Sequence, residues 1–232
     1  MPKHVAVFLR HGEYHQLKDT PSALQPFPLN EQGFLQARDA VKTLKSFAQK
    51  HNWHFHPVIE SSNQLRAWQT ANVICEAMDC FETVKGHDDL SERRLGAAAN
   101  LSTEQIEQVL NVDPRFENPP KNWKSNSHYR LPLQGAESLM EAGERVATYL
   151  QHVMTHLPLK AEAEYPTAKL FVGHGASFRH AAHILGILDF DDIAKLSMYH
   201  ASPIAFSYHE NAKWSHICGD WKIRPPKEEY TD

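Results

Sequence analysis

Apolar residues form two kinds of pattern along the 232-residue chain. Short continuous runs at residues 4–9 and 169–172 are rich in Val, Phe and Leu, which is typical of strands buried on both faces of a sheet. Longer stretches place apolar residues three or four positions apart, which predicts amphipathic helices. Because such strands and helices alternate, the pattern favours an α/β layered sheet.

The remaining elements are predicted from the same periodicities and from turn residues. Helices are expected at about 31–48, 63–78, 102–110, 138–153 and 181–185. Further short strands are expected at 58–59, 81–85, 204–208 and 214–217, the last two as a hairpin around Glu210 and Asn211. Two helix starts have the spacing of a capping box, Ser102 with Gln105 and Ser138 with Glu141.

Two segments lack a regular pattern. Residues 14–29 form a polar loop with three prolines, and residues 112–135 contain four prolines among Asn, Lys and Ser. The second segment is long for a connection inside a compact domain, so we expect either a lid or local disorder. We predict a single domain over residues 1–232, with an irregular lid-like excursion at about 112–135 and a loose tail from Arg224.

Composition narrows the class of protein. Hydrophobic residues make up 41% of the chain and charged residues 22%, as in ordinary globular proteins. The net charge of -4 argues against a general nucleic-acid or membrane-surface binder. No apolar run approaches the roughly 20 residues of a membrane span. The first predicted strand begins at His4, so we expect no targeting segment and a cytoplasmic protein.

Cysteine and histidine spacing does not predict a disulfide framework or a metal site. The three cysteines, Cys75, Cys80 and Cys218, are an odd number without Cys-x-x-Cys spacing, which fits a reducing cytosol. His51, His54 and His56 are close in sequence, but they lack helical i, i+4 spacing and a nearby Cys. We therefore expect a solvated connection at 51–57 and no metal.

Two strands that are far apart in sequence each end in His-Gly, at His11 and at His174. Ligands of open α/β sheets sit outside the carboxyl ends of the strands, so neighbouring strands would bring these imidazoles together. Arg10 lies beside the first histidine, and Arg66 lies at the start of a helix that follows a strand. Two guanidiniums, two imidazoles and a helix N-terminus at one place predict an anion pocket that suits phosphate.

A neutral imidazole in such a pocket can attack phosphorus and form a phospho-enzyme intermediate. The leaving oxygen then needs a proton, which a carboxylic acid can supply. Glu92, in a loop after a predicted strand, is the first candidate for this acid. Glu13, directly after the first His-Gly, is the second.

These residues also resemble a known family. Phe8-Leu9-Arg10-His11-Gly12-Glu13 is similar to the signature of the histidine phosphatase superfamily, also called the phosphoglycerate-mutase-like fold. The resemblance extends over nearly the whole chain. The further matching segments are Pro28-Leu29-Asn30 with Gly33, Ser61-Ser62 with Leu65-Arg66-Ala67, Leu90-Ser91-Glu92-Arg93 with Gly96, Gly135 with Glu137-Ser138-Leu139, and Gly173-His174-Gly175 with Arg179.

The resemblance implies a three-layer α/β/α sandwich with a mostly parallel central sheet. It also implies phosphoryl transfer through a phosphohistidine, with no metal or other cofactor. His11 would be the nucleophile, and Glu92 would be the acid and later the base that activates water. The residues that would hold the phosphoryl oxygens are Arg10, Arg66 and His174. The other expected substrate contacts are Gly12, Tyr14, Arg93 and Gly175.

Departures from the family pattern favour a phosphatase that acts on a small phosphomonoester or a phosphoprotein. Many members carry a small hydroxyl residue and an Asn where this chain has Tyr14 and Leu17, and the mutases have a Trp in the loop that follows. Arg93 resembles a mutase substrate contact, which keeps a cofactor-dependent phosphoglycerate mutase as an alternative. A phosphoprotein-binding module with weak turnover is a third. Ala176 follows His174-Gly175, which argues against the acid phosphatase and phytase branch. No pattern in the sequence predicts an oligomeric state.

Overall fold

The structure, a computed structural model, describes residues 4–158, 165–209 and 211–225. Its main sheet has seven strands in the order β4-β3-β5-β1-β7-β8, and β2 pairs with β5 beside this path. These strands are β1 (His4–Arg10), β2 (His54–Phe55), β3 (Val58–Ser62), β4 (Thr83–His87), β5 (Thr167–Gly173), β7 (Pro203–Tyr208) and β8 (Trp214–Cys218). A separate two-stranded sheet joins β6 (Leu196–Ser197) to β9 (Lys222–Ile223).

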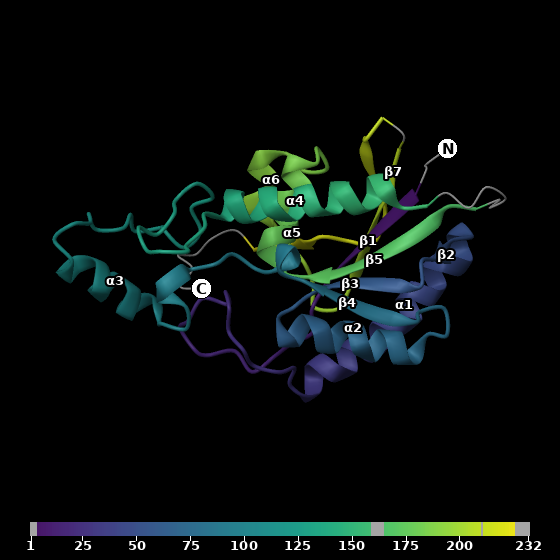
Figure 1. Ribbon diagram of the computed structural model, residues 1–232, viewed down its shortest axis with the longest axis horizontal. Coiled ribbons are helices and arrows are strands. Elements are labelled where there is room, and N and C mark those ends of the chain that lie inside the picture. Colours follow the sequence, from purple (N-terminus) through teal and green to yellow (C-terminus); the bar gives the residue numbers. More distant parts are fainter. Residues whose placement is uncertain (1–3, 159–164, 210, 226–232) are drawn as a thin grey trace.

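Helices cover both faces of the main sheet, with α1 and α2 on one side and α4 and α5 on the other (Figure 1). The helices are α1 (Glu31–His51), α2 (Leu65–Ala77), α3 (Thr103–Val112), α4 (Leu139–His156), α5 (Gly175–Ile184) and α6 (Phe190–Lys195), with 3-10 turns η1 (Asp88–Leu90) and η2 (Gly96–Ala98). The predicted three-layer sandwich is confirmed. Strands β1 to β5 pair in parallel, and β7 and β8 run antiparallel.

The alternation of side chains along β1 explains why the sheet is buried on both faces. Val5, Val7 and Leu9 join the core under α1 and α2, whereas Ala6 and Phe8 join the core under α4 and α5. Phe8 stacks on a phenylalanine of α5, Phe178, at a ring distance of 5.0 Å. The strand that carries His11 at its end is therefore fixed from both sides.

Most predicted helices and strands are present. Both capping boxes form, with Ser102 and Ser138 as the helix caps. The strand predicted at 81–85 lies instead at Thr83–His87, because Phe81 precedes the strand and fills the core under α2. The hairpin is formed by β7 and β8, but Glu210 lies outside the described residues, as do residues 226–232 of the predicted loose tail.

The segment from 113 to 135 forms no helix or strand. It nevertheless has an apolar core of its own, which it shares with η2, α3 and the 14–29 loop; the buried members are Ala23, Leu95, Ala98, Ile106, Leu110, Trp123, Leu131 and Ala136. The indole N–H of Trp123 donates to a carboxylate oxygen of Glu107 on α3 at 3.0 Å. The excursion is thus packed against α3, and its action as a lid stays a prediction.

Among the described helices, none combines the length and the apolar character that a membrane span requires.

Candidate active site

The two His-Gly strand ends are neighbours in the sheet. Arg10 at the end of β1 is opposite Gly173 at the end of β5, and the His11 N–H donates to the Gly173 carbonyl at 3.0 Å. His11 and His174 each follow directly, and their ring centroids are 5.0 Å apart. Both rings are buried, so the sheet order brings together the two imidazoles that the sequence singles out.

Hydrogen bonds fix which nitrogen of His11 carries a proton. Its Nδ1 lies 2.7 Å from the Gly12 carbonyl, which can only accept, so Nδ1 is the donor. Its Nε2 lies 3.2 Å from Nε of Arg66, which can only donate, so Nε2 carries the lone pair. The neutral ring therefore presents an unprotonated nitrogen to the guanidinium side of the site.

His174 is oriented in a similar way. Its Nδ1 accepts from Nη2 of Arg66 at 3.3 Å, and its Nε2 lies 2.9 Å from the Ser62 hydroxyl at the end of β3. Because Nδ1 accepts, Nε2 carries the proton and donates to Ser62. One guanidinium thus contacts both imidazoles, and the ends of β1, β3 and β5 are joined by side-chain hydrogen bonds.

Arg66, in the first turn of α2, is completely buried. Its two Nη atoms donate to the carbonyls of Ala23 and Gln25 at 3.0 and 2.9 Å, and its guanidinium lies 4.5 Å from the ring centroid of Tyr14. Tyr14 is itself buried, and its ring is 5.4 Å from the ring of His11. The 14–29 loop therefore holds the Arg66 side chain in place from outside the sheet.

Arg10 reaches the same region by passing over Gly175, the first residue of α5. A Cβ at Gly175 would come within 3.2 Å of the Cδ of Arg10, so glycine leaves room for this side chain. One Nη atom of Arg10 donates to the Met198 carbonyl at 3.0 Å. Its Nε is buried and has no hydrogen-bond partner among the described residues, so it is available to an anion.

Glu92 is held beside this group of residues by α5. Its carboxylate accepts from the backbone N–H groups of Ser177 at 3.0 Å and Ala176 at 3.2 Å, in the first turn of the helix. Glu92 is 8% exposed, and its carboxylate acts to raise the pKa of both Arg10 and Arg66. Glu13 is exposed and turned away to the start of α1, where it accepts from the Asn30 side-chain amide at 2.9 Å.

Burial and positive charge keep the two imidazoles neutral. Burial lowers the pKa of His11 and of His174 well below the usual histidine value, and the Arg66 charge lowers each further. Burial also lowers the pKa of the Arg10 and Arg66 guanidiniums, which Glu92 partly offsets. The guanidinium of Arg66 is fully buried and that of Arg10 is half-buried, so a bound anion would compensate the positive charge gathered here.

The other predicted contacts have visible structural roles. Gly12 packs against Gly33 at the start of α1, where a Cβ would come within 2.5 Å of the Gly33 carbonyl oxygen. Its N–H already donates to the Thr70 hydroxyl at 3.0 Å. Arg93 is buried beside Glu92, and burial lowers the pKa of its guanidinium. Contact of Gly12, Tyr14, Arg93 and Gly175 with a substrate stays a prediction.

Sequence reasoning missed a third imidazole, His200. Its ring centroid lies 5.7 Å from that of His11, because the next residue, Ala201, donates its N–H to the Arg10 carbonyl. Burial, followed by the charges of Arg10 and Lys222, lowers the pKa of His200 to about 3. The residue follows the two-residue strand β6, which has no readable period in the sequence.

The neutral histidines predict an acid-labile fold. His11, His174, His180 and His200 all have lowered pKa values, to about 4 for His180 and about 3 for His200. Below about pH 6.5 the unfolded chain binds protons on these rings and the folded chain does not. The free energy of unfolding therefore decreases as the pH is lowered. We expect each ring to remove about 1 kcal/mol of unfolding free energy between pH 7 and 5.5.

Urea unfolding at both pH values measures this effect. In His180→Asn the loss of unfolding free energy between pH 7 and 5.5 should be about 1 kcal/mol smaller than in the wild type. An equal loss in the two proteins would show that this ring protonates as readily in the folded chain as in the unfolded chain.

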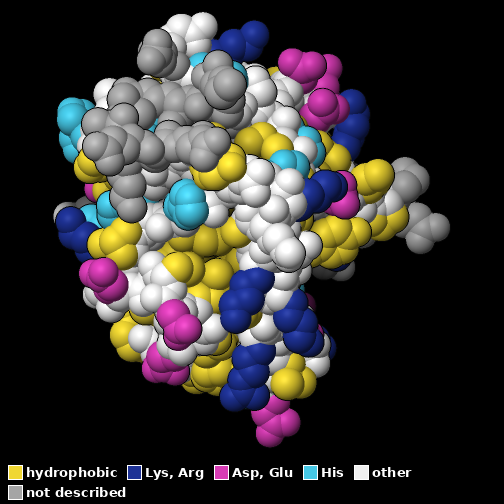
Figure 2. Space-filling model, turned by 90° about the vertical axis from the view of Figure 1, so that its right-hand side faces the viewer, with side chains coloured by type: hydrophobic (Ala, Val, Ile, Leu, Met, Phe, Trp, Pro, Cys, Tyr) yellow, Lys and Arg dark blue, Asp and Glu magenta, His cyan; other side chains and the backbone are white. Residues whose placement is uncertain are grey.

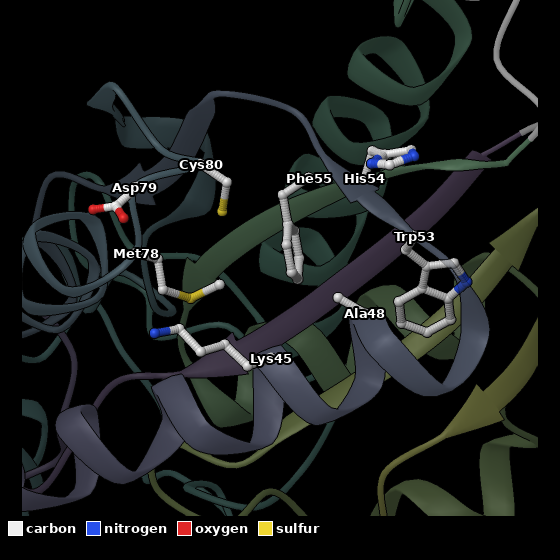
Figure 3. A pocket seen from close by; sticks show the side chains of 8 residues that line it. All are labelled: Lys45, Ala48, Trp53, His54, Phe55, Met78, Asp79 and Cys80. Atoms are coloured by element: carbon white, nitrogen blue, oxygen red, sulfur yellow. The ribbon is translucent and has the colours of Figure 1, made fainter.

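Other parts of the described surface are separate from these residues. A hollow of about 450 Å³ lies between α1, β2 and the segment after α2, and its lining includes Trp53, Phe55, Met78 and Cys80 (Figure 3). Figure 2 views the end of the molecule where β1 begins, and shows Lys and Arg side chains gathered in its lower half. No group of three or more His, Cys, Asp or Glu side chains suited to a metal ion is found within the described ranges.

An α/β/α sandwich whose central strands end in two neutral imidazoles, flanked by the guanidiniums of Arg10 and Arg66, defines a protein suited to bind a tetrahedral oxyanion. The chain belongs to the histidine phosphatase superfamily (branch 1), whose family model matches residues 6–220. The family resemblance seen in the sequence is thereby confirmed.

Two curated relatives of the chain are phosphoglycerate mutases. The chain is 27% identical over 224 residues to a 2,3-bisphosphoglycerate-dependent phosphoglycerate mutase of Bifidobacterium longum, with 89% of this chain and 87% of that protein covered. It is 25% identical over 219 residues to 2,3-bisphosphoglycerate-dependent phosphoglycerate mutase 2 of Lactobacillus johnsonii, with 87% and 91% covered.

Two solved structures share the fold. A mycobacterial glucosyl-3-phosphoglycerate phosphatase in complex with inorganic phosphate has a TM-score of 0.66 at 22% identity, with 93% of this chain and 96% of that chain covered. The alpha-ribazole phosphatase from Shigella flexneri has a TM-score of 0.67 at 15% identity, with 92% and 94% covered. These likenesses establish the architecture, and the chemistry has to be argued from the residues.

Proposed function

We propose that this protein is a metal-independent phosphatase that hydrolyses phosphomonoesters through a phosphohistidine on His11. The observation that carries the proposal is the unprotonated Nε2 of His11 beside the buried guanidinium of Arg66, with the Nε of Arg10 buried and without a hydrogen-bond partner among the described residues. A phosphate dianion supplies the missing negative charge and places phosphorus next to a nucleophile.

In the first step the Nε2 lone pair of His11 forms a bond to phosphorus while the ester P–O bond breaks. The electron pair of that bond leaves on the alcohol oxygen, which takes a proton from the Glu92 carboxylic acid. In the second step water attacks phosphorus, gives its proton to the Glu92 carboxylate, and releases Nε2 with its electron pair. Arg10, Arg66 and His174 hold the non-bridging oxygens, and inorganic phosphate is the product.

Glu92 is favoured over Glu13 as the proton donor by position. The Glu92 side chain is buried, bonded to the first turn of α5, and close enough to Arg10 and Arg66 to raise the pKa of both. Glu13 is exposed and bonds to Asn30 at the start of α1.

A pair of matched variants tests this assignment. Glu92→Gln should lower kcat on an alkyl phosphate by about 10²-fold, because the leaving alkoxide loses its proton donor. Glu13→Gln makes the same change at the exposed carboxylate. Its kcat should stay within about threefold of the wild type, because Glu13 is not the general acid in this mechanism. The reverse order of effects in a phosphate-release assay would transfer the role to Glu13.

The mutase reading is the second candidate, because both named curated relatives are mutases and Arg93 is buried beside Glu92. Incubation with 3-phosphoglycerate and a 2,3-bisphosphoglycerate primer separates the two functions. A phosphatase releases inorganic phosphate and forms little 2-phosphoglycerate. Isomerisation faster than phosphate release would replace the proposed function.

Metal independence is tested directly. We expect phosphate release to be unchanged after dialysis against excess EDTA, because both guanidiniums and the Glu92 proton are supplied by the chain itself. Loss of activity that is restored by a divalent cation would contradict this expectation.

We further propose a small-molecule phosphomonoester or a phosphoprotein as substrate, no nucleic-acid or membrane partner, and a cytoplasmic location. The net charge of -4 and the three free thiols, Cys75, Cys80 and Cys218, support these assignments.

A further inference from the structure

The loop that carries Glu92 is bound through its carbonyls to a single side chain of α4, that of Arg145. Nη1 of Arg145 donates to the carbonyls of Asp89 at 2.8 Å, Ser91 at 3.1 Å and Asp88 at 3.3 Å. Nη2 donates to the carbonyl of Glu92 itself at 3.4 Å. The guanidinium therefore binds the main chain of the residues that precede Glu92 and the main chain of Glu92 itself.

The other edge of this guanidinium is fixed by Glu137, just before α4. Nε and Nη2 of Arg145 donate to the two carboxylate oxygens at 2.9 and 2.8 Å, in a bidentate pair. The side chains of Arg145 and Glu137 are only 13% and 17% exposed. Glu137 also holds the loop on the far side of Glu92, because its carboxylate accepts from the Arg94 N–H and its own N–H donates to the Arg94 carbonyl.

The carboxylate of Glu92 is held separately, by backbone N–H groups of Ser177 and Ala176 on α5. The main chain of Glu92 thus depends on α4 and its side chain on α5. These two helices pack closely, with Gly143 of α4 against His180 of α5. A shift of the loop by a fraction of an ångström would pull the carboxylate away from the helix N-terminus and from the leaving oxygen.

We propose that Arg145, oriented by Glu137, is a positioning residue that places Glu92 for proton transfer. The inference rests on the proposed function, in which Glu92 is the proton donor and then the base. Arg145 is assigned no contact with substrate. A lysine keeps the charge but cannot make the planar fork that reaches a carboxylate and several carbonyls at once.

Leaving-group dependence distinguishes positioning from a merely structural role. 2,4-Dinitrophenyl phosphate releases its leaving group without a proton, whereas glycerol 2-phosphate needs one. In Arg145→Lys we expect single-turnover transfer from glycerol 2-phosphate to fall by at least about tenfold, and transfer from the dinitrophenyl ester to stay within about threefold. Steady-state turnover of the dinitrophenyl ester should then show a burst, because Glu92 is also needed to activate water.

Two further variants make the test specific. Glu137→Gln should show the same selective loss, to a smaller degree, and it provides a second reading if Arg145→Lys fails to fold. Arg130→Ala removes an exposed ion pair to the same helix, with Glu141, and should behave as the wild type. Circular dichroism and thermal unfolding establish that each variant is folded.

A double-variant cycle completes the test. In a Glu92→Gln background, Arg145→Lys should cause no further loss on glycerol 2-phosphate. Equal losses on both substrates, no loss on either, or losses that multiply with Glu92→Gln would overturn the inference. Failure of the proposed function looks different, because His11→Ala would then remain active or Glu92→Gln would itself lack leaving-group selectivity.

Discussion

His11→Ala is expected to lower hydrolysis of an aryl phosphate by roughly 10⁴-fold or more and to leave the fold intact. The size of the effect follows from loss of the nitrogen that would bond to phosphorus, and among the described residues no other imidazole presents its Nε2 to the Nε of Arg66. Turnover of 4-nitrophenyl phosphate measures the loss. Circular dichroism and thermal unfolding report on the fold.

Trapping of the intermediate gives an independent reading. Acid-labile, alkali-stable label from a radioactive phosphomonoester should appear on the wild type and be absent from His11→Ala. His152→Ala, which changes an exposed imidazole on α4, is the matched control and should label normally. Label that survives in His11→Ala would favour a different nucleophile. If the wild type binds every phosphomonoester tried but hydrolyses none, a phosphoprotein-binding module is favoured.

Arg66→Ala is expected to lower both the rate of phosphate release and the free energy of unfolding. Activity should fall by about 10³-fold, because a donor to the phosphoryl oxygens is lost. The variant also leaves the carbonyls of Ala23 and Gln25 without their buried donor, at about 1–3 kcal/mol each. Relief of a desolvated charge offsets part of this cost, so we expect unfolding free energy to fall by about 2–4 kcal/mol.

Urea unfolding and phosphate binding measure the two effects separately. Inorganic phosphate should raise the thermal midpoint of the wild type and have little effect on Arg66→Ala. Arg38→Ala, which removes an exposed guanidinium from α1, should keep the response of the wild type. Equal phosphate stabilisation in wild type and Arg66→Ala would show that Arg66 does not bind the anion.

The sequence predicts the two histidines and Arg66 because each stands directly after or just beyond a strand whose apolar run is easy to read. The two histidines lie side by side because β1 and β5 are neighbouring strands, with Arg10 opposite Gly173 in their register. Glu92 is harder to assign, since a loop carboxylate has no period. Its role becomes arguable only when the N–H groups of Ser177 and Ala176 are seen to hold it.

Other parts of the site have no signal that a single sequence can carry. Arg145 is a mid-helix arginine eight positions from Glu137. Its proposed role depends on hydrogen bonds to loop carbonyls that point toward it only in the folded chain. The short elements β2, α6, β6 and β9 contain too few residues to show periodicity, so the position of His200 after β6 could not be derived. Sequence patterns predict helices, strands and the residues at strand ends. Which backbone N–H and carbonyl groups surround a given side chain can be seen only in the folded chain.

Ala23 contacts both the candidate active site and the apolar cluster outside the main sheet, and its carbonyl faces the first of these. It receives Nη2 of Arg66, while the Ala23 side chain belongs to the apolar cluster shared by α3 and the 113–135 segment. An insertion or deletion in that segment has to be accommodated beside Ala23, and so next to the guanidinium that contacts both imidazoles. Changes in the outer segment therefore bear on the position of Arg66, and through it on the proposed phosphate site, even though the strands themselves need not change.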